Sequence, residues 1–264
     1  MEEPTTTSPA DPGGPRSGIW KVARVPLGIL GWVPLILAGA VPDYRVAVTS
    51  ALGVALFNQL CIYALHRLTG FPRIWPRTLD SIFTVLFLAL TIAAWADQSR
   101  DEEIEAWTGF VINGGLFLGA TIAGLSGHSF IKDEMASNER FTQAQLSHPV
   151  LLHTTRVMLW LWLGVFGLMA LVSLVGGVRD LFEPKPSSQF VYAFSNPAYL
   201  TFVVLIAGGA ATGLYTWRMR ADRKFITAIA SRYQRELEAW AEANPEDPWA
   251  KLKHEEDANT LTSP

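Results

Sequence analysis

The chain has 264 residues, of which 50% are hydrophobic and only 17% are charged. Soluble domains carry about a quarter of charged residues, and their surface helices need a polar outer face. Because the charges are crowded into the two tails and a few short loops, the composition excludes an ordinary soluble fold. The formal net charge of -3 says little about partners, and no nucleic-acid partner is expected.

The chain opens with a segment rich in Pro, Gly, Thr and Ser, so residues 1–23 are predicted to form a disordered tail. A bilayer core about 30 Å thick is crossed by a helix of about 20 apolar residues. Six stretches approach that length: 24–41, 46–65, 81–96, 106–126, 157–178 and 198–217. Pro34 predicts a kink in the first of them. The prediction is an all-α, six-span transmembrane bundle over residues 24–217.

The distribution of basic residues predicts the orientation of this bundle. Cytosolic segments carry an excess of Lys and Arg close to the ends of the spans. With the N-terminus placed inside, all but four of the 21 basic residues fall on inside segments, and the exceptions are Arg45, Arg100, Arg179 and Lys185. We therefore expect both termini to be cytosolic, in a multi-pass protein of the plasma membrane whose surroundings are the lipid bilayer.

Past the sixth span the sequence turns polar. Residues 218–243 carry apolar side chains on one side and four basic residues at the start. This pattern predicts one cytosolic amphipathic helix held near anionic lipid, with short coiled-coil pairing as the alternative. Residues 244–264 are predicted to be a disordered tail.

Small residues recur every four positions in two of the spans. In lipid, such stripes let helix backbones approach closely. We expect helix packing at Gly115, Gly119, Gly127, Gly209 and Gly213. A ligand or conduction path along the stripe is the alternative interpretation.

The spans contain no ionisable residue at mid-depth by this assignment, because Asp80 falls at the start of the third. That absence argues against a carrier or pump built on buried carboxylates. Gln59, Tyr63 and His66 share one face of the second span, where hydrogen bonding between helices or a polar substrate path could use them.

Three further histidines, His128, His148 and His153, fall on the cytosolic side together with His66. A metal or haem site is the alternative interpretation, but His148 and His153 are five positions apart, whereas helical ligand pairs are three or four apart. No metal, cofactor or catalytic residue is predicted.

The longest cytosolic segment, 127–156, mixes apolar and polar residues and is the most distinctive part of the chain. It follows Pro76-Arg77-Thr78-Leu79-Asp80, begins with Gly127-His128-Ser129-Phe130-Ile131, and ends with HPVLLHTTRVMLW from His148. Over about residues 75–175 this order of motifs resembles a family of bacterial six-helix membrane proteins likened to the intracellular septation protein A family. The resemblance implies six helices in a bacterial inner membrane and no established activity.

Three functions remain open from the sequence. The first is a structural or interaction role at the cytosolic membrane face, with a membrane protein or a second copy as partner. The second is a small-molecule transporter or channel, and the third is a membrane enzyme that uses the cytosol-facing histidines.

Overall fold

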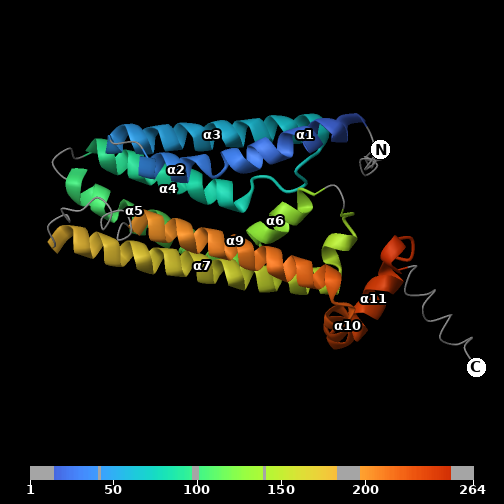
Figure 1. The fold of residues 1–264 in the computed structure, drawn as a ribbon. Helices are drawn as coiled ribbons and strands as arrows, with labels where there is room; N and C mark the ends of the chain where they lie inside the picture. Colours follow the sequence, from blue (N-terminus) through green and yellow to red (C-terminus); the bar gives the residue numbers. More distant parts are fainter. Residues whose placement is uncertain (1–14, 41–42, 97–100, 139–140, 183–196, 251–264) are drawn as a thin grey trace, which may run out of the picture. The chain divides into compact units, whose positions relative to one another are not determined.

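The computed structural model describes residues 15–40, 43–96, 101–138, 141–182 and 197–250, and these are helical, with no strand among them. The elements are α1 (Pro15–Leu30), α2 (Val33–Ala40), α3 (Tyr44–Thr69), α4 (Thr78–Ala96), α5 (Asp101–Leu125), α6 (Phe130–Ala136), the short 3-10 helix η2 (Gln145–Ser147), α7 (Pro149–Phe182), α9 (Pro197–Ala221), α10 (Arg223–Arg232) and α11 (Gln234–Ala243). The predicted all-α fold is confirmed (Figure 1).

Six helical stretches are long and apolar enough to cross a membrane, which confirms the predicted number of spans. They are Gly18–Leu37, Tyr44–Thr69, Thr78–Ala96, Ala106–Leu125, Pro149–Arg179 and Leu200–Ala221. Each of these stretches carries large apolar side chains that are exposed, as a lipid-facing surface requires.

The first span is interrupted between α1 and α2 rather than smoothly kinked. Pro34 has no N–H to donate to the carbonyl of Leu30, and its ring crowds that carbonyl. The regular helix therefore stops at Leu30 and resumes at Val33, and the Trp32 N–H donates instead to Ile29 O at 3.0 Å. This leaves Gly31 in a helix break within a membrane-spanning stretch.

The chain divides into two compact units. The first comprises Met1–Asp101 with Ala136–Arg140, and the second comprises Glu102–Met135 with Phe141–Pro264. In the first unit α3 packs against α1, α2 and α4. Its apolar core includes Trp20, Ile62 and Phe71, and the Trp20 indole N–H donates to the Ser137 carbonyl at 2.8 Å.

The segment between α3 and α4 folds back along α3. Gly70, at a φ of 76°, ends α3, and the Phe71 N–H bonds to Thr69 Oγ1 at 3.1 Å. Further back on α3, His66 Nδ1 lies 2.8 Å from the Pro72 carbonyl, and the rings of Tyr63 and Trp75 lie 4.8 Å apart. The first residues of a segment expected to be a cytosolic loop, Phe71 and Pro72, are thus buried against the helix.

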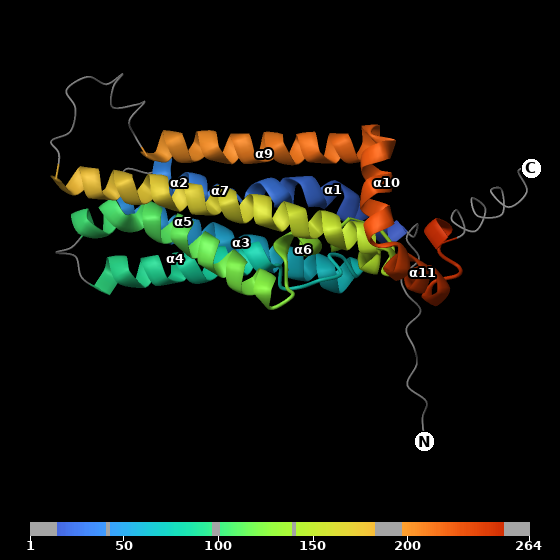
Figure 2. The ribbon, with the colours of Figure 1, turned by 90° about the horizontal axis from the view of Figure 1, so that it is seen from below.

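In the second unit α7 packs against α9, and glycines mark close approaches (Figure 2). A Cβ added at Gly208 would lie 2.6 Å from Val165 Cγ2, and one at Gly177 would lie 2.9 Å from the Ala106 carbonyl oxygen. A Cβ at Gly209 or Gly213 would meet nothing within 4 Å. The close contact on α9 therefore forms one residue earlier than the expected stripe, which faces open space in this chain.

The other glycines of the expected stripes differ from one another. Gly115 and Gly119 are half-buried on α5. Gly127 lies beyond α5 at a φ of 80°, with nothing within 4 Å of an added Cβ, so it forms the turn that ends the helix. The His128 N–H closes that turn on the Ala123 carbonyl at 2.8 Å. The left-handed conformation explains a glycine at this position.

Substitution of Gly177 tests the packing of α5 against α7. We expect Gly177→Ala to lower the free energy of unfolding by about 1–3 kcal/mol, because a backbone carbonyl cannot move aside as a flexible side chain can. Gly164→Ala on the same helix is the matched control, since an added Cβ there meets nothing within 4 Å. Thermal unfolding in detergent measures both variants, and equal stability of the two contradicts the contact.

Candidate functional site

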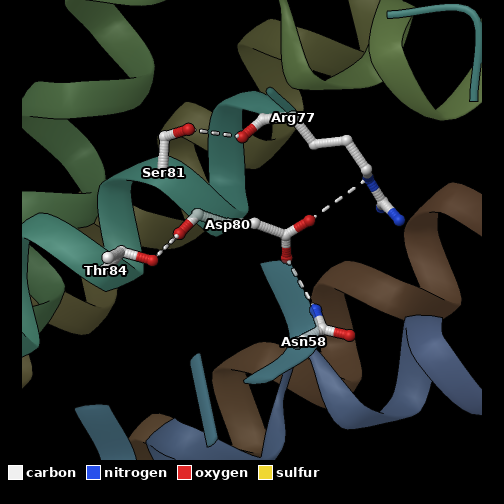
Figure 3. Close-up of polar contacts among 5 residues, drawn as sticks. All are labelled: Asn58, Arg77, Asp80, Ser81 and Thr84. Carbon is white, nitrogen blue, oxygen red and sulfur yellow. Dashed lines mark hydrogen bonds and ion pairs between the residues drawn. The ribbon is translucent and has the colours of Figure 1, made fainter. Parts of the chain in front are cut away.

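A buried polar cluster lies in the first unit where α4 begins beside the middle of α3. The Asn58 amide Nδ2 donates to Asp80 Oδ1 at 3.3 Å, and Arg77 Nε lies 3.5 Å from Asp80 Oδ2 (Figure 3). Asn58 is 1% exposed and Asp80 is 8% exposed. A carboxylate, a guanidinium and an amide thus meet inside the protein.

Asp80 lies near the start of the third span, as the assignment expected, but it contacts the middle of the second. Asn58 precedes the end of α3 by about three helical turns, or about 16 Å. Its contact with Asp80 places the carboxylate at the same level, because the fold-back of residues 70–77 delays the start of α4. An ionisable group at such a depth is costly unless it is paired, and Arg77 pairs it.

Local structure explains why the first turn of α4 holds these residues. Asp80 lies at a helix N-terminus, where the helix dipole favours a negative charge. The Ser81 hydroxyl donates to the Arg77 carbonyl at 2.9 Å, and the Thr84 hydroxyl donates to the Asp80 carbonyl at 2.8 Å (Figure 3). These bonds fix the backbone that carries the ion pair.

The break in the first span faces the same cluster. A Cβ added at Gly31 would lie 3.2 Å from Asp80 Oδ1 and 3.5 Å from Asn58 Nδ2. Asn58 Oδ1 is buried without a hydrogen-bond partner among the described residues. Three elements therefore meet at one point: the break between α1 and α2, the middle of α3 and the start of α4. The chemistry available there is the holding of a buried charge or the exchange of a proton.

The predicted polar face of the second span has a structural explanation for two of its three members. His66 and Tyr63 contact the folded-back segment, at Pro72 and Trp75. Gln59 is half-buried on α3. Asn58, one position before Gln59, is a polar residue of the same span, and the sequence did not indicate that its partner is Asp80.

The four histidines are divided between the two units. His66 belongs to the first unit, whereas His128, His148 and His153 belong to the second and have different neighbours. His128 is exposed in the turn after α5, with Nδ1 3.1 Å from the Ser126 carbonyl. His153 Nδ1 lies 3.0 Å from the Tyr233 hydroxyl. Within the described ranges, no group of three His, Cys, Asp or Glu side chains is placed to hold a metal ion.

A second polar cluster joins the C-terminal segment to the residues before α7. We call residues 141–148, α10, α11 and residues 245–250 the C-terminal module. The Trp240 indole N–H donates to the Ala144 carbonyl at 3.0 Å, and Asp247 accepts from Thr142 Oγ1 at 3.1 Å and from Gln145 Nε2 at 3.3 Å. Trp240 and Asp247 are both 8% exposed, so the module has a small core of its own.

The module differs from the sequence expectation in two ways. Residues 218–243 form the end of α9 and two helices, because Asp222 caps α10 by accepting the Phe225 N–H at 3.1 Å and Tyr233 separates α10 from α11. Residues 245–250, expected in a disordered tail, pack with Asp247 and Ala250 buried. The remainder of that tail, and residues 1–14, lie outside the described residues.

His148 lies at the centre of the module between two tryptophans. Its ring centroid is 4.7 Å from that of Trp240 and 5.0 Å from that of Trp249, both nearly perpendicular. Burial lowers the pKa of His148 below the usual histidine value, and the nearby Asp247 carboxylate opposes that shift. The folded module therefore favours the neutral ring.

This preference predicts that acid loosens the module. The folded-state pKa of His148 is lower than that of the free side chain, which is about 6.5. The stabilisation of the folded module by the neutral ring is therefore complete above pH 6.5 and is lost as the pH falls below that value. We expect amide hydrogen exchange in α11 to accelerate between pH 7.5 and 5.5, beyond the intrinsic pH effect. His148→Gln should abolish this dependence, and its persistence in that variant contradicts the assignment.

The chain matches no protein-family model, no curated protein and no solved structure.

Proposed function

We propose that this chain is a multi-pass plasma-membrane protein with a structural or interaction role at the cytosolic face, exerted through the C-terminal module. The observation that carries the proposal is the docking of a post-span segment on residues 141–148 through Trp240 and Asp247. Such a folded, mostly polar surface beside apolar spans suits a membrane-protein partner or a second copy of the chain.

The orientation and the relationship are parts of the same proposal. The excess of Lys and Arg on alternate segments supports cytosolic termini. The motifs of residues 75–175 support a relationship to the bacterial six-helix proteins likened to the septation protein A family.

Photocrosslinking in cells tests the interaction role. A photoreactive amino acid at Ala239, exposed on α11, should yield one discrete membrane-protein adduct or a dimer of this chain. We expect Trp240→Ala to abolish the adduct, whereas Glu242→Ala, an exposed change on the same helix, should preserve it. An adduct that is absent in the unaltered chain, or unaffected by Trp240→Ala, contradicts the proposal.

A second candidate function is favoured by the Asp80 cluster. A paired carboxylate beside a helix break inside the spans is the type of group that proton- and cation-coupled carriers use. Proteoliposomes that hold a pH-sensitive dye should then acidify under a proton gradient with the unaltered chain and not with Asp80→Asn. Equal, negligible flux in both removes this candidate.

A further inference from the structure

The end of the sixth span carries a hollow between α9 and α10 in the second unit. The cavity has a volume of about 520 Å³ and is lined by Trp217, Arg218, Ala221, Asp222, Arg223 and Lys224. This volume falls in the range of about 300–1,000 Å³ that is usual for small-molecule sites. The hollow exists because α9 ends at Ala221 and α10 leaves it in a new direction after the Asp222 cap (Figure 2).

The charges around the hollow favour an anion. Arg218, Arg223 and Lys224 stand against one acidic side chain, Asp222. Asp222 is already engaged, since Oδ1 caps α10 and Oδ2 lies 3.9 Å from Arg218 Nε. Arg223 and Lys224 are exposed, and neither forms an ion pair with another described residue. Two cationic groups are therefore available to a phosphate.

The apolar side of the hollow continues along the span. Trp217 is 66% exposed at the end of α9, where an indole suits the membrane interface. Gly213 and Gly209 precede it at intervals of four residues and so lie on the same stripe of the helix. A Cβ at either glycine meets nothing within 4 Å, so along this stripe the surface of α9 is open and no side chain covers it.

We propose that this hollow binds the headgroup of an anionic glycerophospholipid, with one acyl chain lying along the open stripe of α9 over Gly213 and Gly209. A phosphate alone would use only the cationic end, whereas a lipid matches both the cationic end and the apolar span beside it. Lipids surround the hollow, because the membrane-spanning stretch of α9 ends there. The hollow shares the first residues of α10 with the C-terminal module but involves neither Trp240 nor Asp247, which carry the interaction proposal, so either proposal can fail alone.

Native mass spectrometry of the full chain in detergent, titrated with phosphatidylglycerol or phosphatidylcholine, tests the site. We expect one phosphatidylglycerol to be retained in preference to phosphatidylcholine. Arg223→Gln with Lys224→Gln should weaken its retention about 10- to 30-fold, at about 1 kcal/mol for each basic residue near a lipid surface. Arg232→Gln with Arg235→Gln removes the same charge from exposed positions outside the hollow and should change retention less than threefold, roughly what a distant surface charge contributes.

The proposed acyl position has its own pair of variants. Gly213→Leu places a bulky side chain where the acyl chain is proposed to lie and should reduce retention, whereas Gly164→Leu places the same side chain at an equally open position on α7, outside the hollow, and should not. This pair remains decisive if the change at Arg223 and Lys224 impairs folding. Equal loss in the two charge variants, no preference for phosphatidylglycerol, or displacement of the lipid by equimolar inorganic phosphate would each overturn the proposal.

Discussion

Asp80→Ala is expected to lower the free energy of unfolding by about 3–5 kcal/mol, the range for a buried ion pair that loses one partner. The loss arises because the Arg77 guanidinium, whose side chain is 15% exposed, is left without the carboxylate 3.5 Å away. Asn58 loses its acceptor in the same change. Unfolding by added denaturing detergent, followed by circular dichroism, measures the effect.

Two further variants separate the charge from the hydrogen bond. Asp80→Asn keeps an acceptor for Asn58 but removes the negative charge 3.5 Å from Arg77, so we expect most of the loss to remain. Arg77→Leu combined with Asp80→Leu removes both charges, and a buried pair replaced by apolar groups costs little. If the double variant is as unstable as the sum of its single changes, the two side chains do not act as a pair.

Trp240→Ala is expected to release the C-terminal module while leaving the spans folded. Deletion of a buried tryptophan side chain costs about 3–5 kcal/mol, which is as much as a small core supplies. The indole also donates to the Ala144 carbonyl, which is left without that partner. Hydrogen exchange should show lost protection in α11 and residues 141–148, and unchanged protection in α7.

The control for this change is Glu242→Ala, which is exposed on the same helix. Its exchange pattern should match that of the unaltered chain. If Trp240→Ala also leaves α11 protected, then the contacts of Trp240 do not hold the module in place.

The spans were predictable because hydropathy and length suffice to identify them. The break at Gly31 was predictable in part. Pro34 indicated a disturbance of the helix, but the regular helix is lost between Leu30, whose carbonyl Pro34 cannot bond, and Val33. The Asp80 cluster was missed because a span count takes α4 to begin at the membrane surface. Only the tertiary contacts of Thr69, His66 and Tyr63 show that the preceding segment returns along α3.

The C-terminal module was predicted in part. Residues 218–243 were expected to be helical, but residues 245–250 have a composition typical of a tail, and the core of the module depends on partners about 100 positions earlier. The two tryptophans, Trp240 and Trp249, were the available signal, since a disordered tail is usually poor in aromatic residues.

The central claim is that six spans place alternate connections on opposite sides of the membrane, with both termini in the cytosol. Cysteine accessibility in intact cells tests it most directly, in a Cys61→Ala background that removes the single native thiol. Single cysteines replace Ser8, Ser99, Asn138, Ser187 and Ser263. We expect a membrane-impermeant maleimide to label positions 99 and 187 in intact cells, and the other three only after permeabilisation. Labelling of position 8 or 263 from outside, or of all five after extraction without detergent, contradicts the account.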